Sequence, residues 1–230
     1  MNSDGDLVAA IRGVLADAGD PERAASQQAY MKSEMPYRGI SSPELRRLLA
    51  PLLGDYRPTS RRQHETTVRT LWDSATHREE WYAAIAVARH RRVRSWLDAT
   101  SLDLSGHLVV TGAWWDVVDE IASHLVGAAL AHDRRAATPT IWAWASDADP
   151  WLRRTAVICQ LGAKVDTDVD LLRHAVEVNV ADSSFWLRKG IGWALREYAK
   201  TDPAWVRSEV GRHGDLMSGL TRREATKHLH

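Results

Sequence analysis

The chain has 230 residues, of which 44% are hydrophobic and 26% are charged, so it is long and apolar enough to fold around its own core. Its 30 basic and 30 acidic residues cancel, which excludes a uniformly basic nucleic-acid binder and leaves open a local basic face. The one cysteine, Cys159, excludes an internal disulfide and a multi-cysteine zinc site. No apolar run approaches the roughly 20 residues that a bilayer requires, and the first residues lack a signal pattern, so we expect a cytoplasmic protein.

Helical periodicity extends over most of the chain. Apolar residues recur at three- and four-residue steps at 26–32, 43–53, 59–74, 78–90, 114–131, 139–145, 150–161, 168–180 and 184–200. Pro150 and Pro203 suit the first turns of helices, and Thr221 with Glu224 reads as the capping box of a last short helix. No alternating strand pattern of useful length occurs. We therefore predict an all-α fold of stacked antiparallel helix pairs, with residues 1–230 forming one domain and residues 1–5 flexible.

A short motif recurs at two of the predicted helix starts. Trp-Leu-Arg-Arg at 151–154 and Trp-Leu-Arg-Lys at 186–189 begin 35 residues apart (186 minus 151). That distance is about the period of a two-helix repeat. The alternative is a chance match of four residues.

The helix predicted from Trp114 onwards combines aromatic and acidic side chains. Trp115 and Asp119 are four residues apart and therefore share a face. Asp116 lies in the first turn, where the helix dipole favours a carboxylate, whereas Asp119 lies further in. Asp119 is thus either an acid that stabilises a cation beside Trp115 or a solvated or ion-paired side chain.

Two arginines, Arg153 and Arg154, lie in the first turns of the helix predicted at 150–161. Backbone N–H groups also point outward there, which favours a phosphate. A cation at this end opposes the helix dipole, so the alternative is a salt bridge. The candidate acids are Asp147, Asp149 and Asp119.

The helix predicted at 184–200 carries aromatic and basic side chains together with two glycines. Those that fall near one another at helical steps are Trp186, Lys189, Trp193, Arg196 and Lys200. Gly190 and Gly192 each cost about 1 kcal/mol relative to Ala inside a helix, so we expect a close approach to the backbone there. The approaching group is either a neighbouring helix or a ligand.

Other chemistries find little support. The ten histidines show no paired-ligand spacing, so we expect no metal site. Neither a P-loop nor a dinucleotide-binding glycine pattern is present. Cys159 lies on an apolar helical stretch, which favours a buried inert thiol over a nucleophile.

Four segments of the chain resemble, in the same order, the AlkD-like DNA alkylation repair enzymes. They are residues 30–40, 114–119, 151–156 and 188–198, and the similarity continues at 202–203 and 222–225. One such motif would be a weak signal, whereas four in order are specific. Gly190 departs from the pattern, because many members of that family carry a larger residue there.

The resemblance implies a HEAT-like repeat α-solenoid with a concave DNA-binding face that acts without metal or other cofactor. We expect a monomer, because the enzyme would bind duplex DNA on one face, and a cytoplasmic location associated with the nucleoid. It implies a monofunctional DNA glycosylase that begins base excision repair. Such an enzyme hydrolyses the N-glycosidic bond of cationic alkylpurines, including 3-methyladenine, 7-methylguanine and bulkier adducts, in duplex DNA.

The resemblance also implies roles for individual residues. Carried over by motif, Asp119 is the catalytic carboxylate, and Trp115 and Trp193 line the site. Arg154 and Tyr30 are expected to contact DNA there. The further candidates for DNA contact are Arg153, Arg188, Lys189 and Arg196.

Two other functions remain open at this point. One is a HEAT-repeat DNA-binding or scaffold protein without catalysis, since many solenoids only bind. Asp119 speaks against it, because a carboxylate near phosphates would repel DNA. The other is a self-resistance glycosylase dedicated to one bulky natural-product adduct, which the sequence does not distinguish from general repair.

Overall fold

The computed structural model describes residues 4–229 and confirms the all-α prediction: 74% is helix, and residues 4–229 contain no strand. The chain divides into two compact units, Met1–Trp96 and Leu97–His230, which are described separately. That residues 1–230 act as one domain stays a prediction. The expected flexibility of residues 1–5 falls mostly on residues 1–3, which lie outside the described residues.

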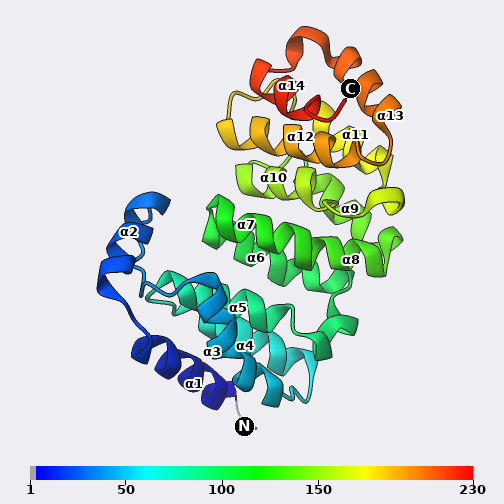
Figure 1. Cartoon of the computed structure of the whole chain (residues 1–230). Helices are drawn as coiled ribbons and strands as arrows, with labels where there is room; N and C mark the ends of the chain where they lie inside the picture. Colours follow the sequence, from blue (N-terminus) through cyan, green and yellow to red (C-terminus); the bar gives the residue numbers. More distant parts are fainter. Residues whose placement is uncertain (1–3, 230) are drawn as a thin grey trace. The chain divides into compact units, whose positions relative to one another are not determined.

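The first unit is built from α-helices and ends in a short 3₁₀ helix (Figure 1). Its elements are α1 (Asp4–Asp17), α2 (Pro21–Met31), α3 (Ser42–Asp55), α4 (Arg61–Asp73), α5 (Arg78–Ala88) and η1 (Arg91–Trp96). Helix α1 packs against α3, α4 and α5, and α4 packs against α5. The core between them is apolar and includes Ile11, Val68 and Leu71, each without exposed surface.

A buried carboxylate holds the segment between α2 and α3. Glu79, on α5, has no exposed surface and accepts hydrogen bonds from three consecutive backbone N–H groups. The donors are Arg38 at 2.9 Å, Gly39 at 3.0 Å and Ile40 at 3.1 Å. Because these N–H groups belong to an irregular segment, the carboxylate replaces the partners that regular structure would supply.

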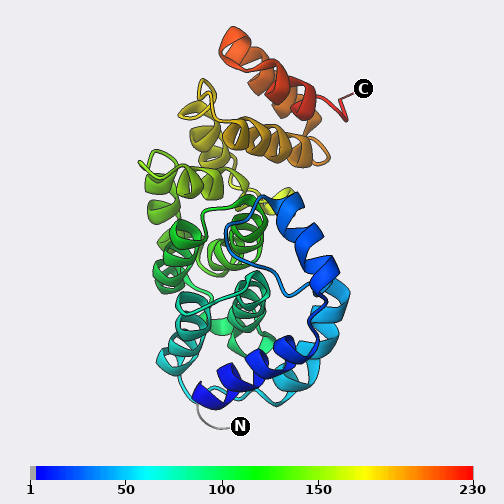
Figure 2. The ribbon, with the colours of Figure 1, turned by 90° about the vertical axis from the view of Figure 1, so that its left-hand side faces the viewer.

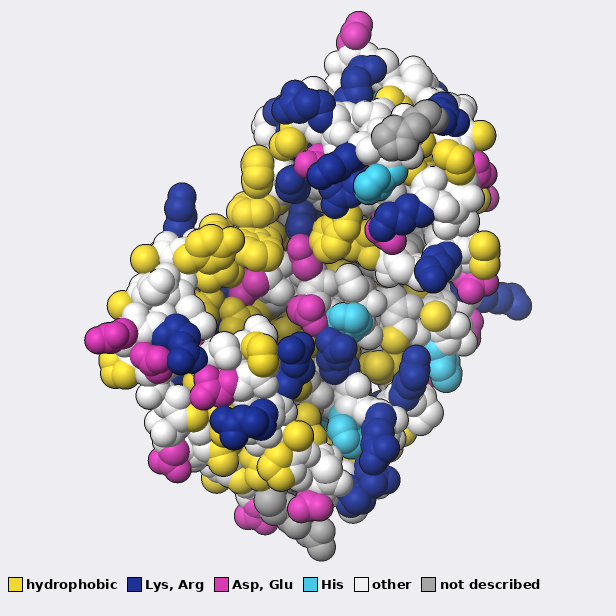
Figure 3. Space-filling view, in the orientation of Figure 1, with side chains coloured by type: hydrophobic (Ala, Val, Ile, Leu, Met, Phe, Trp, Pro, Cys, Tyr) yellow, Lys and Arg dark blue, Asp and Glu magenta, His cyan; other side chains and the backbone are white. Residues whose placement is uncertain are grey.

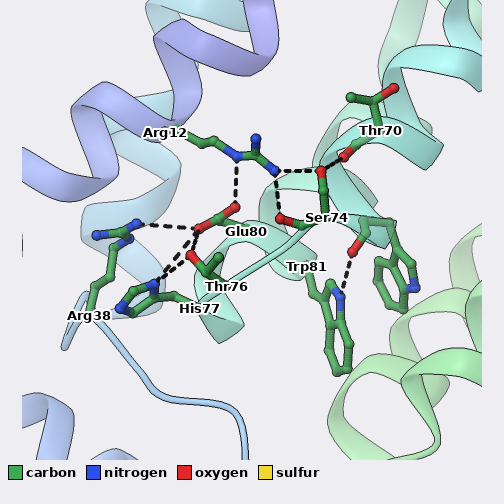
Figure 4. A network of polar contacts seen from close by, with 9 residues as sticks. Arg12, Arg38, Thr70, Ser74, Thr76, His77, Glu80 and Trp81 are labelled. Carbon is green, nitrogen blue, oxygen red and sulfur yellow. Dashed lines mark hydrogen bonds and ion pairs between the residues drawn. The ribbon is translucent and has the colours of Figure 1, made fainter.

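The neighbouring residue, Glu80, joins the same segment to α1 (Figure 4). Its carboxylate accepts from Arg12 Nε at 2.9 Å, from Arg38 Nη2 at 3.3 Å and from Thr76 Oγ1 at 3.0 Å. Arg12 Nη2 also donates to the carbonyl of Ser74 at 2.9 Å. Two adjacent buried acids thus connect α1, α5 and the segment that follows α2.

The second unit is a stack of helix pairs, which Figures 1 and 2 show as successive rows. Its elements are η2 (Ala99–Ser101), α6 (Leu102–Gly112), α7 (Trp115–Ile121), the π-helical η3 (Ala122–Val126), α8 (Gly127–His132), α9 (Arg134–Trp144), α10 (Pro150–Ile158), η4 (Lys164–Asp166), α11 (Val169–Glu177), α12 (Phe185–Tyr198), α13 (Pro203–His213), η5 (Gly214–Leu216) and α14 (Gly219–Ala225). Helix α10 is central, since it packs against α6, α7, α9, α11 and α12. Helix α12 packs in turn against α14.

Most predicted helices form, and their starts follow the expected capping chemistry. The side chains of Asp149 and Asp202 cap α10 and α13, and Pro150 and Pro203 occupy the first positions, as predicted. The repeated Trp-Leu-Arg motif begins at the second residue of both α10 and α12, so the two helix starts are equivalent. None of the helices in the part of the chain described is long and apolar enough to cross a membrane.

Three details differ from the sequence-based prediction. Helices α1 and α6 were not predicted, and α9 begins at Arg134, because Asp133 caps it and the helix accommodates Pro139. Helix α14 begins at Gly219 and not at a capping box of Thr221 and Glu224. Ser218 is its cap and accepts from the Thr221 N–H at 3.1 Å.

We expect Glu79→Ala to lower the free energy of unfolding by about 3 kcal/mol or more, because three backbone N–H groups lose their acceptor. Glu79→Gln keeps one acceptor oxygen and should lose less. Urea unfolding followed by circular dichroism measures both. Glu22→Ala, at an exposed position in the first turn of α2, is the control and should change stability by less than about 1 kcal/mol. Similar losses for Glu79→Ala and Glu22→Ala would contradict this account.

Candidate functional site

The site in the second unit is built around an ion pair between α7 and α10. Asp119 lies one turn after Trp115 on α7, as the sequence predicts. Its Oδ1 accepts from Arg154 Nε and its Oδ2 from Arg154 Nη2, both at 2.8 Å. This bidentate geometry is the strongest that a carboxylate and a guanidinium can form. Of the alternatives that the sequence left open, the structure shows the ion pair of Arg154 with Asp119.

The first turn of α12 completes the surroundings of the guanidinium. Arg154 Nη1 donates to the backbone carbonyl of Trp186. A Cβ added at Gly190 would lie 3.0 Å from the same nitrogen, so the absence of a side chain there makes room for Arg154. All three guanidinium nitrogens thus donate to protein groups from two neighbouring helices.

The two partners differ in their access to solvent. The side chain of Arg154 is 3% exposed, whereas that of Asp119 is 16% exposed. Direct contact of Arg154 with a phosphate would require the guanidinium to leave its buried position, so its role as a DNA contact stays a prediction. The carboxylate is the member of the pair that an incoming molecule can reach.

Burial governs the protonation of the carboxylate. Desolvation raises the pKa of Asp119 above its ordinary value, and the hydrogen bonds and positive charge of Arg154 oppose that rise. The negative charges of Asp116 and Glu120 add to the increase in the pKa. The ionised form of Asp119 is therefore less stable than that of an aspartate in water.

An aromatic cluster lies beside the ion pair, with Trp186 at its centre. The Trp115 ring is stacked on Trp186 with centroids 6.3 Å apart and planes at 18°. The rings of Trp114, Trp151 and Phe185 lie around Trp186 at centroid distances of 5.6, 6.0 and 5.0 Å. Phe185 is 54% exposed, so the cluster reaches the surface.

The start of α7 is positioned by a left-handed residue. Ala113 ends α6 with φ of 38°, and Trp114 follows in extended backbone as the N-cap of α7. This turn places both tryptophans at the start of α7, where they meet the start of α12. Trp193 lies further along α12, seven residues after Trp186, and is half-buried.

The predicted DNA-binding cations of the second unit are held by acids or carbonyls. Arg153 Nη1 donates to Asp182 at 2.8 Å, and Arg188 Nε donates to the Asp182 carbonyl at 2.8 Å. Arg153 therefore forms an ion pair, with an acid that the sequence did not suggest. The negative charge of Asp182 offsets the unfavourable position of this arginine at the N-terminal end of a helix.

Glu224 on α14 binds the other two cations. Its carboxylate accepts from Lys189 Nζ at 3.2 Å and from Arg196 Nη1. The hydrogen bond from Lys189 is the main cause that lowers the pKa of Glu224, and the charges of Lys189 and Arg196 contribute. DNA contact by either cation stays a prediction, now for a side chain whose charge is partly compensated.

The two remaining residues of the sequence-based prediction are Tyr30 and Lys200. Tyr30, on α2, belongs to the first unit and is 80% exposed, so its place beside Asp119 stays a prediction. Lys200 does not join Lys189 and Arg196 at Glu224, because it forms an ion pair with Glu197 at 2.6 Å. Lys200 and Glu197 line a separate cavity of about 290 Å³ between α10, α11 and α12.

The sequence analysis grouped Trp186 with other side chains of its helix but assigned none of Trp186, Trp151 and Glu224 to the site. The repeated Trp-Leu-Arg motif was the available signal for the tryptophans, because it marks two equivalent positions on helices that pack together. Cys159 is fully buried, and burial raises the pKa of its thiol to about 12, which agrees with an inert thiol. Among residues 4–229, no group of three or more His, Cys, Asp or Glu side chains is arranged to hold a metal ion.

The model of the DNA alkylation repair enzyme family matches residues 11–229. A predicted DNA alkylation repair enzyme from Enterococcus faecalis has a similar structure, with a TM-score of 0.83 and 31% identity, covering 92% of this chain and 96% of that one. The alkylpurine DNA glycosylase AlkC from Pseudomonas fluorescens, solved with DNA containing an abasic site analogue, has a TM-score of 0.50 and 17% identity. That match covers 98% of this chain and 62% of AlkC and shows similarity of fold alone. No curated protein matches the chain.

The glycines of α12 yield a stability prediction. A Cβ at Gly192 would lie 2.5 Å from Glu224 Cβ and 3.1 Å from the Thr221 carbonyl, so Gly192→Ala must separate α12 from α14. We expect it to destabilise the protein by about 1–3 kcal/mol, as overpacking does. Urea unfolding measures the effect.

The matched control is Gly13→Ala on α1, where a Cβ would meet no atom within 4 Å. This change should stabilise the protein by about 0.5–1 kcal/mol, because alanine favours the helix. Equal, favourable effects at both glycines would rule out the tight contact between α12 and α14.

Proposed function

Because the chain belongs to the DNA alkylation repair enzyme family, we propose that it is a monofunctional DNA glycosylase. Its substrates are cationic N3- and N7-alkylated purines in duplex DNA, with 3-methyladenine and 7-methylguanine as the simplest cases. The observation that carries the proposal is the Asp119 carboxylate, held in place by Arg154 and accessible beside a cluster of tryptophans.

Hydrolysis of this glycosidic bond requires little protonation of the leaving base. An alkylated purine already carries a positive charge, so the C1′–N bond can break with the electron pair leaving on the base, which departs neutral. Positive charge then develops on the sugar as an oxocarbenium-like centre. A carboxylate near that centre stabilises it, and water adds to C1′ and loses a proton to give the abasic product.

Each part of the site has a role in this proposal. Asp119 faces the developing charge and orients the water. Trp115 and Trp193 hold the cationic nucleotide through cation–π contacts, which desolvation strengthens to about 2 kcal/mol or more. Trp186 buttresses Trp115 by stacking on it. The DNA contacts that the sequence suggests are Tyr30, Arg153, Arg154, Arg188, Lys189 and Arg196.

Arg154 is a positioning residue in this scheme. Two of its nitrogens hold the Asp119 carboxylate and the third binds the Trp186 carbonyl, which fixes the pair between α7, α10 and α12. Its positive charge favours the ionised form of the carboxylate. A fixed carboxylate does not need to reorganise as charge develops on the sugar, which is the main source of electrostatic catalysis.

The first test is release of 7-methylguanine and 3-methyladenine from methylated duplex DNA under single-turnover conditions. Asp119→Asn should slow release about 100-fold or more, the scale of losing one preorganised charge-stabilising group, while duplex binding is retained. Glu120→Gln removes an exposed carboxylate from the same helix and should keep the wild-type rate. Equal rates for wild type and Asp119→Asn would assign the ion pair a purely structural role.

Binding without release by wild type would favour a non-catalytic DNA-binding protein or a glycosylase for bulkier adducts. Repeating the assay with a bulky N3- or N7-purine adduct distinguishes these two.

The pKa of Asp119 gives a prediction for pH. Because the ionised form acts, release should be full above the pKa of Asp119 and decline as the pH falls through it. Burial raises that pKa, so the decline should begin at a higher pH than an ordinary aspartate gives. Arg154→Gln removes the group that lowers the pKa and should move the midpoint to still higher pH. Rates corrected for spontaneous depurination measure both profiles, and identical midpoints would contradict the role given to Arg154.

A further inference from the structure

A second concentration of charge lies in the first unit, where α3 ends and where the chain leaves α5. Arg57 follows the end of α3, and Arg91, Arg92 and Arg94 lie on η1, directly after α5. We call these four residues the η1 arginine patch. Figure 3 shows Lys and Arg side chains gathered, with His among them, over this part of the molecule. Residues 89–97 contain four arginines and no acid.

The patch has a defined framework. Arg57 Nη1 donates to the carbonyls of Gly54 at 2.6 Å and Tyr56 at 3.0 Å, which fixes the guanidinium at the C-terminal end of α3. The ring of His90 lies edge-on against Tyr56, with centroids 5.8 Å apart. Tyr56 thus joins the two segments that carry the arginines.

Beneath the patch lies a buried pair that adds no charge. The Tyr56 hydroxyl and His64 Nδ1 are 3.0 Å apart and share a hydrogen bond. Burial lowers the pKa of His64 to about 4, so this imidazole is neutral at physiological pH. The positive charge of the patch therefore lies on its exposed arginines.

The arginines repel one another. Partial burial is the main cause that lowers the pKa of His90, and the charges of Arg92, Arg91 and Arg57 lower it further. The pKa of Arg92 is lowered by local desolvation and then by the charges of Arg57 and Arg91. Arg91, Arg92 and Arg94 are exposed, and none forms an ion pair with a described residue. An anion bound at the surface would relieve this repulsion.

The arrangement fits a row of phosphates. Residues three apart eclipse each other in a 3₁₀ helix, so Arg91 and Arg94 project from one side of η1, separated by about 6 Å along its axis. Guanidinium groups suit phosphate oxygens, which they bind in bidentate geometry. A membrane fits less well, because the exposed large apolar side chains of the described chain all lie outside residues 54–96.

We propose that the η1 arginine patch, whose residues are different from those that act on the lesion, binds the phosphate backbone of duplex DNA. The partner rests on the proposed function, which makes duplex DNA the substrate. Contacts to phosphates alone are independent of base sequence and of damage. The patch would therefore hold undamaged and damaged duplex equally and contribute to affinity, not to the chemical step.

The test is the salt dependence of binding to undamaged duplex, measured by fluorescence anisotropy on the full chain. For Arg91→Gln combined with Arg94→Gln, which removes the pair on one side of η1, two lost phosphate contacts should reduce the slope of log K against log salt by about 1.8. Between 50 and 200 mM salt the variant should then lose about 10-fold less affinity than wild type loses. Arg91→Lys with Arg94→Lys keeps the charge and should keep most of the slope.

The control is Arg23→Gln, which removes another exposed arginine of the same unit whose charge is already matched by Asp20 and Glu44. It should keep the wild-type slope. A slope in the double glutamine variant equal to that of wild type or of Arg23→Gln would overturn the proposal. So would binding of anionic lipid vesicles, or of single-stranded RNA, that depends on the patch while binding of duplex does not.

The base-release assay separates this proposal from the proposed function. If wild type releases no alkylpurine but the double glutamine variant loses salt dependence on duplex, the glycosylase proposal fails and the patch stands. If wild type releases alkylpurines and the slope is unchanged, the patch fails and the glycosylase proposal stands.

Discussion

The site depends on one interaction, the bidentate ion pair between Asp119 and Arg154. Removing two charges from water costs several kcal/mol per ion, and only good geometry with further hydrogen bonds offsets that cost. Here the geometry is bidentate, and the Trp186 carbonyl satisfies the third nitrogen of the guanidinium. Three helices, α7, α10 and α12, therefore have to keep their relative positions for the pair to exist. Gly190 contributes by leaving the space that the guanidinium occupies.

The same interaction explains why the Asp119 carboxylate, and not the Arg154 guanidinium, is accessible to solvent. Arg154 is enclosed by α10 and α12, whereas Asp119 lies on the outer side of the pair. Burial raises the pKa of Asp119, and Arg154 limits that rise. The result is a poorly solvated carboxylate whose ionised form is stabilised by Arg154, so its negative charge acts strongly on a nearby cation. A solvated aspartate at the surface would be screened by water, and an unpaired buried one would be protonated.

Local features of the site could be predicted from the sequence, and long-range ones could not. The shared face of Trp115 and Asp119 follows from helical spacing, and Pro150 with Asp149 defines the start of α10. The partner of Arg154 lies 35 residues away, so several acids fitted equally well until the helices were placed. Glu224 fitted a capping box by spacing, but Ser218 caps α14 and Glu224 binds Lys189 and Arg196. Helix α6, which contains Gly106 and two adjacent valines, lacks a strong helical signal of its own, and its burial against α7 and α10 compensates for that.

The zero net charge of the chain is consistent with a DNA-binding function because the charges are not distributed evenly. In the second unit the basic residues of α10 and α12 are bonded to Asp119, Asp182 and Glu224, so their role is largely to fix the positions of helices. The η1 arginine patch has no such partners, and its charges remain available to an external anion. Counting basic residues would therefore point to α10 and α12 as the main source of electrostatic affinity. Counting uncompensated charges points to η1, and in water the uncompensated charges determine how strongly a protein attracts a polyanion.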